Sequence, residues 1–100
     1  MFVRISISQP RAEAREEYIS IEDDLISHFS EQEGFMEAYR LVNDDYVGRL
    51  SFWQSQEAAD HVANSQHTLS VLSRLVQLEL VNERPRLELH FEGTEPKKKS

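Results

Sequence analysis

The sequence predicts an α+β fold in which helices cover one face of an antiparallel sheet. Four short segments alternate apolar and polar residues, which is typical of strands with one buried face. Two longer segments place apolar residues three and four positions apart, which is typical of helices. These segments follow one another as strand, helix, strand, strand, helix, strand, and the length of 100 residues suits a single domain.

The N-terminal part of the chain is expected to form one strand and one long helix. Residues 2–8 alternate and form the strand, which Pro10 ends. The helix is expected over residues 11–33, and Gly34 suits the left-handed conformation that caps many helices. The apolar stripe of this helix consists of Ala14, Tyr18, Ile21, Leu25 and Phe29.

The middle of the chain predicts a β-hairpin. Residues 35–42 and 46–53 are strand-like, and the residues between them, Asn43-Asp44-Asp45, favour a turn. In the second of these strands apolar side chains occur at both odd and even positions. We therefore expect both faces of the sheet to be covered.

The C-terminal part predicts a second helical region and a last strand. Ser55 is a favourable N-cap for a helix over residues 56–77. Asn64-Ser65 interrupts this helix, and because Ser65 can cap a new segment, we expect a break or kink there. Residues 86–92 alternate again and form the fourth strand.

This order of elements corresponds to the ferredoxin-like βαββαβ arrangement. We expect residues 1–93 to form one domain and residues 94–100 to form a polar C-terminal tail. His90 alternates with its apolar neighbours, so we place it on the sheet face away from the helices. Because that face also carries apolar side chains, we expect a homodimer in which two sheets close into a dimeric α+β barrel.

Composition excludes several classes of function. The chain has 18 acidic and 11 basic residues and a formal charge of −7, which argues against a nucleic-acid partner. It has no cysteine, which excludes disulfides, thiolate nucleophiles and iron–sulfur clusters. No apolar run is long enough for a membrane span, and the first residues lack a signal peptide, so we expect a cytoplasmic protein without a membrane partner.

The order of elements and the segment 52–67 resemble the antibiotic-biosynthesis-monooxygenase-like family of dimeric α+β barrels. In that family a tryptophan often ends the third strand, a serine opens the helix, an acidic–alanine pair and a histidine follow, and a Ser-x-His step comes next. Gln66 departs from the pattern, because relatives commonly have proline there. The matching residues in this chain are Trp53, Ser55, Glu57, Ala58, His61, Ser65 and His67.

The resemblance implies a small monooxygenase that oxidises a phenol or quinol with molecular oxygen and no cofactor. His67 and His61 are the candidate catalytic bases, because a neutral imidazole accepts a phenolic proton near neutral pH. The alternative for both is a structural or surface histidine. Six residues of continuous helix rotate by about 600°, so the two side chains diverge by about 120° and no shared metal is expected.

Four further residues are assigned to a substrate pocket between sheet and helices. Trp53 ends a strand and can form a wall of the pocket, although a core or dimer contact is the more ordinary role. Tyr39 and Phe29 are placed in the same space, with core packing again the alternative. Arg49 shares a face with Trp53, and an arginine on a covered face needs a carboxylate or an anionic ligand. A buried ion pair or a salt bridge across the dimer is the favoured interpretation.

Two functions remain open from the sequence. One is a cofactor-independent monooxygenase that acts on a small aromatic phenol or quinol. The other is a non-catalytic protein of the same fold that binds a small hydrophobic molecule or serves as a dimer scaffold. An enzyme should contain a closed apolar pocket of about 300 Å³ or more with a histidine pointing into it.

Overall fold

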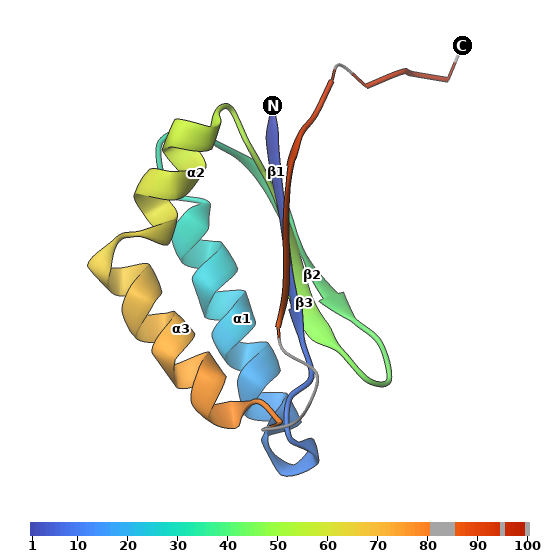
Figure 1. Ribbon diagram of the computed structural model, residues 1–100, viewed down its shortest axis with the longest axis vertical. Coiled ribbons are helices and arrows are strands. Elements are labelled where there is room, and N and C mark those ends of the chain that lie inside the picture. The colour runs from blue at the N-terminus through green and yellow to red at the C-terminus, as the bar shows by residue number, and fades with distance from the viewer. Residues whose placement is uncertain (81–85, 95, 100) are drawn as a thin grey trace.

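A computed structural model describes residues 1–80, 86–94 and 96–99 of the chain. They form two layers, with the helices on one face of a four-stranded antiparallel sheet of order β2-β3-β1-β4 (Figure 1). The predicted α+β, ferredoxin-like fold is confirmed. The elements are β1 (Phe2–Ser8), the 3-10 turn η1 (Ala12–Ala14), α1 (Arg15–Phe29), β2 (Phe35–Val42), β3 (Val47–Trp53), α2 (Gln56–Ala63), α3 (Gln66–Leu78) and β4 (Leu87–Glu92).

The predicted break in the second helical region is also confirmed. Ser55 begins α2, and its hydroxyl accepts a hydrogen bond from the amide of Ala58 at 3.1 Å. Ser65 begins α3 in the same way, accepting from the amide of Thr68 at 3.3 Å. Each cap satisfies an amide that has no partner within its own helix. After the break, α2 lies against β3 while α3 runs alongside α1 (Figure 1).

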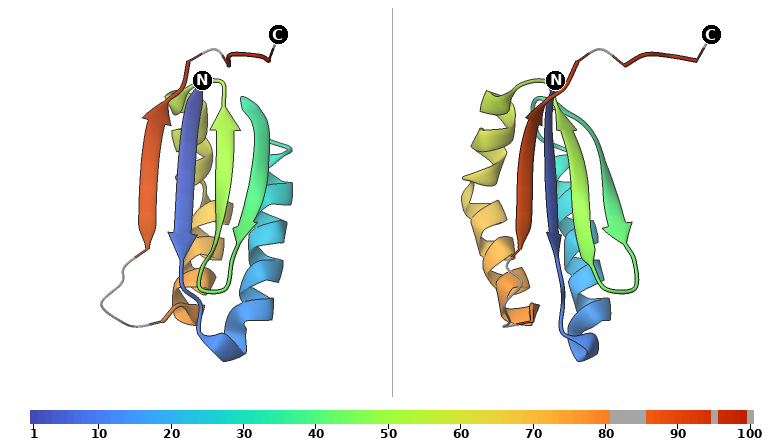
Figure 2. Two further views of the ribbon diagram at one scale, coloured as in Figure 1. Left: turned by 90° about the vertical axis from the view of Figure 1, so that its right-hand side faces the viewer. Right: turned by 45° about the vertical axis from the view of Figure 1, so that its right-hand side comes forward.

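The face of the sheet toward the helices carries polar as well as apolar side chains, whereas the opposite face is mainly apolar. Ser6 and Ser8 of β1 are buried on the face toward the helices, and Ser8 bonds to Tyr18 of α1. The strand residues between them point to the opposite, open face, which no described helix covers (Figure 2). The open face carries Val3, Ile5, Ile7, Tyr39, Leu50, Phe52, Leu87, Leu89 and Phe91.

The expectation that His90 faces away from the helices is wrong. His90 pairs in register with Arg4, and Arg4 in turn bonds to the carbonyl of Ala59 in α2. It is Leu89 and Phe91 that lie on the open face, 39% and 49% exposed. Alternation along a strand separates two sets of side chains, but it does not state which set meets the helices.

The buried core is supplied mainly by the helices. Tyr18, Ile21, Leu25 and Phe29 of the predicted α1 stripe are all buried. The sheet adds Phe2, Val47 and Trp53, and α2 and α3 add Ala59, Val62, Val71 and Leu75. No helix in the described part of the chain is long and apolar enough to cross a bilayer.

Candidate functional site

A cavity of about 250 Å³ lies between the sheet and the helices. It is smaller than the pocket expected of an enzyme, and it is not uniformly apolar. Its sheet side is mainly polar, with Trp53 as its aromatic member, and the polar residues there are Arg4, Ser6, Arg49, Ser51, Glu88 and His90. Its helix side is mainly apolar and includes Phe29, Val62, Leu69 and Leu72. The cavity can therefore hold a flat apolar ring against the helices and polar substituents against the sheet.

Arg4 and His90 form the polar contact at one end of this cavity. They lie opposite each other on the adjacent strands β1 and β4. Nε and Nη2 of Arg4 lie 3.3 and 3.2 Å from the same Nε2 of His90. A guanidinium has only donors, so Nε2 of His90 accepts and the proton of the neutral ring is on Nδ1. Nη1 of Arg4 donates to the carbonyl of Ala59 at 3.3 Å.

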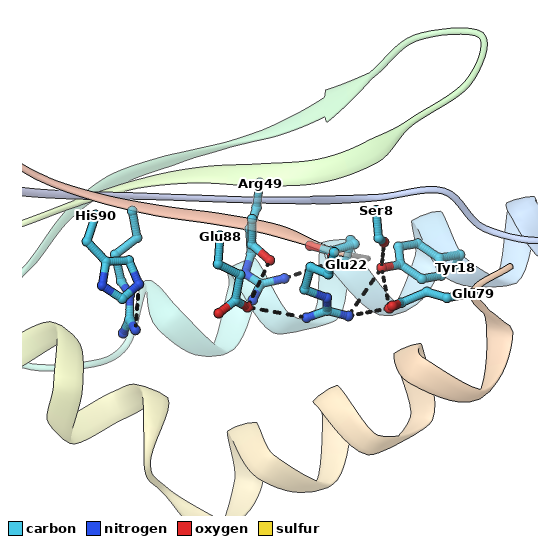
Figure 3. A network of polar contacts seen from close by, with 10 residues as sticks. Ser8, Tyr18, Glu22, Arg49, Glu79, Glu88 and His90 are labelled. Carbon is cyan, nitrogen blue, oxygen red and sulfur yellow. Dashed lines mark hydrogen bonds and ion pairs between the residues drawn. The ribbon is translucent and has the colours of Figure 1, made fainter. Parts of the chain in front are cut away.

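Arg49 and Glu22 form a buried ion pair beside the cavity (Figure 3). Nη1 of Arg49 donates to Oε1 of Glu22 at 2.8 Å, and the side chains are only 10% and 1% exposed. This confirms the interpretation that an arginine on the covered face has a carboxylate partner. Oε2 of Glu22 has no hydrogen-bond partner among the described residues. Burial raises the pKa of Glu22, because lost hydration outweighs the attraction of Arg49.

A second polar cluster continues from the cavity toward the other end of the sheet (Figure 3). The Tyr18 hydroxyl donates to Oε2 of Glu79 at 3.0 Å and accepts from Ser8. Arg86 bonds to Glu79 and lies 3.7 Å from a carboxylate oxygen of Glu88. Burial raises the pKa of Tyr18 to about 12, so this phenol stays protonated. The cluster ties α1 to β1, β4 and the chain after α3.

The structure places three of the predicted pocket residues together. Trp53, Arg49 and Phe29 all line the cavity. The Trp53 ring packs edge-on against Phe29, with 5.5 Å between ring centroids, and its indole N–H donates to the Ser51 hydroxyl at 3.0 Å. Tyr39 lies elsewhere: it is half-exposed on the open face of the sheet, and its ring contacts Phe52.

The two predicted bases lie on the outer surface and do not line this cavity. The His67 ring stacks on His28 of α1, with 3.8 Å between centroids. Partial burial and the neighbouring His67 lower the pKa of His28. His61 faces shallow depressions beside Glu57 on α2. No group of three metal-ligating side chains converges anywhere in the described residues.

Sequence reasoning missed Arg4 and His90. The pattern did contain a signal, because each is a polar residue between two apolar residues in a strand. Two such strands side by side place their polar residues on one face. The alternation alone does not show that this polar face is the one that the helices cover.

Comparisons with known proteins give the fold. No protein-family model and no curated protein matches the sequence. Solved structures match over nearly the whole chain. Rv0793 from Mycobacterium tuberculosis is 18% identical, with a TM-score of 0.83 and coverage of 95% of this chain and 96% of that chain.

Two further structures carry informative names. SnoaB, a cofactor-independent oxygenase from Streptomyces nogalater, is 15% identical at a TM-score of 0.80, covering 95% of this chain and 94% of its own. A Deinococcus radiodurans structure, provisionally named an antibiotic biosynthesis monooxygenase, is 11% identical at a TM-score of 0.86, covering 98% and 97%. The chain therefore has the fold of the antibiotic biosynthesis monooxygenases, as the resemblance of its sequence implied.

Proposed function

We propose that this protein is a monooxygenase that oxidises a small aromatic phenol or quinol with O₂ and without a bound cofactor. The observation that carries the proposal is the divided lining of the cavity. Phe29 and Trp53 offer apolar contact to an aromatic ring, while Arg4, Arg49 and Ser6 offer hydrogen-bond donors to its oxygen atoms. The fold shared with SnoaB, which is named a cofactor-independent oxygenase, supports the same activity.

The chemistry needs only the substrate, O₂ and a place for one proton. Removal of the phenolic proton gives an electron-rich phenolate, which passes one electron to O₂. The resulting radical and superoxide combine through a new C–O bond at an unsubstituted ring carbon. Protonation gives a hydroperoxide, and loss of water leaves a quinone. One phenol and one O₂ thus yield one quinone and one water, with all electrons supplied by the substrate.

The scheme requires a base that takes the phenolic proton. His67 and His61 stay as predictions from the family resemblance, but the cavity described here is not lined by either. That placement favours the second candidate function, in which the cavity binds a small hydrophobic molecule without transforming it. The two candidates share the same binding site, so they differ only in whether O₂ is consumed.

We also propose that the protein acts as a homodimer. The open face of the sheet carries half-exposed apolar side chains, including Tyr39, Leu87 and Phe91 at 49–50% exposure. A second copy of the same face would remove these side chains from water.

An oxygen-uptake assay with a panel of hydroquinones and naphthols tests the function. We expect uptake with at least one compound, and one ¹⁸O atom in the product when ¹⁸O₂ is supplied. Trp53 is the only tryptophan and lines the cavity, so its fluorescence reports binding independently of turnover. Fluorescence quenching by the panel with no oxygen uptake would favour the non-catalytic function. If no compound of the panel quenches the fluorescence and none causes oxygen uptake, both candidate functions are overturned.

A further inference from the structure

We infer that Arg4 and His90 act as one unit that ionises the substrate: His90 takes the phenolic proton at Nε2, and Arg4 binds the phenolate that this creates. The inference rests on the proposed function, since it supplies the base that the oxidation requires. Both residues line the cavity, and they come from the adjacent strands β1 and β4.

In this contact a single acceptor atom, Nε2 of His90, faces two N–H donors of Arg4. Nε and Nη2 of Arg4 both approach His90 Nε2, at 3.3 and 3.2 Å, although that atom has a single lone pair. A phenolic O–H of the substrate can replace these donors at Nε2. The two guanidinium N–H groups are then free to donate to the same phenolic oxygen. The contact between Arg4 and His90 thus marks the position at which the phenolic oxygen would be bound.

Both side chains are fixed by contacts that do not involve this shared atom. Nη1 of Arg4 donates to the Ala59 carbonyl at 3.3 Å and lies 3.9 Å from a carboxylate oxygen of Asp60. The His90 ring meets the edge of Phe2, with 5.8 Å between centroids. The guanidinium and the imidazole can therefore keep their places when the substrate enters between them. Positioned donors and acceptors of this kind are the usual source of proton-transfer catalysis.

The proton-transfer step is balanced. The phenolic O–H bond breaks, its electron pair stays on oxygen, and an N–H bond forms at Nε2 of His90. The products are a phenolate and an imidazolium, so the net charge in the cavity does not change. After O₂ has added to the ring, the imidazolium returns its proton to the peroxide oxygen. That proton leaves in the water molecule formed with the quinone, and His90 is neutral again.

The charges around the cavity favour a neutral phenol over a permanent anion. Each arginine of the lining already has a carboxylate near it, Glu22 for Arg49 and Asp60 for Arg4. Glu88 adds a further negative charge to the lining. A ligand that enters uncharged and is ionised only beside Arg4 meets less repulsion than one that carries a carboxylate. The substrate class is therefore a phenol or quinol without an acidic substituent.

Binding of 4-nitrophenol tests the pair without any need for oxidation, because its phenolate is coloured. Next to the Arg4 guanidinium we expect the apparent pKa of the bound probe to fall by about one unit or more. The shift should be lost in Arg4→Met and reduced in His90→Gln, which keeps an acceptor but cannot take a proton. His28→Gln is the matched control, since this histidine lies on the outer surface against His67. An unchanged shift in Arg4→Met would overturn the inference.

Turnover supplies the second measurement. In His90→Gln we expect kcat with an active phenol to fall by about 100-fold or more, with little change in the dissociation constant measured by Trp53 fluorescence. The inference would be overturned if His90→Gln kept the wild-type kcat while His67→Gln or His61→Gln lost most of it. The proposed function would then still hold, with a different base. The protein could also shift the pKa of bound 4-nitrophenol through Arg4 and His90 and yet consume no oxygen. That result would support the role of Arg4 and His90 in ionising the ligand and would reject the oxygenase function. His90 lies at the sheet edge and is exposed, so its substitution should not prevent folding.

Discussion

At the level of single residues, the polar groups between the two layers set what the cavity can do. Ser6, Arg49 and Ser51 are buried there, where an apolar core would be expected. Buried polar groups are costly unless they are paired. Ser6, Arg49 and Ser51 each have a side-chain partner, and one oxygen of Glu22 is the buried side-chain atom that lacks one among the residues that the structure describes.

The Glu22–Arg49 pair tests how strongly a buried charge depends on its partner. Glu22→Leu should lower the free energy of unfolding by about 3–5 kcal/mol, because it leaves the Arg49 charge buried without a partner. The double variant Glu22→Leu/Arg49→Met should recover most of that loss, since it removes both charges. Urea denaturation of the wild type and of the single and double variants measures these differences.

The Asp23–Arg40 pair is the matched control. Its two side chains are 52% and 39% exposed, although the contact is short at 2.6 Å. Asp23→Ala should therefore cost less than about 1 kcal/mol. If Glu22→Leu were as mild as Asp23→Ala, or if the double variant were no more stable than the single one, Arg49 would not depend on Glu22.

The sequence identified part of the candidate site for a clear physical reason. A charge on a covered strand requires a partner, which is why Arg49 was expected to have one and does. For Trp53 the sequence favoured a core or dimer contact over a pocket wall, and the residue is buried in the core while its side chain also lines the cavity. Arg4 and His90 were not identified, since their place depends on which sheet face the helices cover. That choice is made by packing of whole elements and is not encoded in the alternation of one strand.

At the level of elements, Gly48 of β3 lies directly against the backbone of β1. A Cβ atom there would lie 2.1 Å from the carbonyl oxygen of Ser6 and 2.8 Å from the Cα of Ile7. Both are backbone atoms of β1, so the strand itself would have to move. The same strand carries Arg4, and β3 carries Arg49, which makes the pairing of these strands a condition for the geometry of the cavity.

We therefore expect Gly48→Ala to destabilise the fold by about 1–3 kcal/mol. Gly93→Ala is the control, because a Cβ there would approach mainly the flexible Met1 side chain, at 3.0 and 3.2 Å. Thermal denaturation followed by circular dichroism compares the two. Equal melting temperatures would show that β1 can shift without cost, contrary to the register observed here.

The positions of the elements were largely predictable, while their ends were less so. Asn64-Ser65 signalled the break between α2 and α3 because a serine hydroxyl can cap a new helix. The first helix was expected to reach residue 33, but α1 ends at Phe29. The chain beyond it turns through backbone bonds from Ser30 to Ile26 and from Gln32 to Phe29. Such turns carry polar residues that a helix also accepts, so the sequence pattern does not separate them.

At the level of the whole molecule, the arrangement of the two layers is the reverse of a simple amphipathic design. The helices cover a sheet face on which serines, arginines and a glutamate stand beside Phe2, Val47 and Trp53, and the more uniformly apolar face is left open (Figure 2). A single copy would keep Leu87, Leu89 and Phe91 of the edge strand β4 in water. The sequence predicted this need for a cover, although it did not predict which face would require it.

The dimer is the prediction that follows at this scale. A second copy on the open face should bury an area within the range of stable interfaces, about 1,200–2,000 Å² in total. We expect sedimentation velocity at micromolar concentration to give a dimer for the wild type and a folded monomer for Leu89→Glu, because a charge in the centre of an apolar interface is not paired there. Val76→Glu is the control: this valine is 58% exposed, but it belongs to α3 and not to the sheet. A wild type that remains folded and monomeric under these conditions would mean that the open face tolerates water, and the dimer would have to be abandoned. The inference about Arg4 and His90 would survive that result, because both residues and all their contacts belong to one copy of the chain.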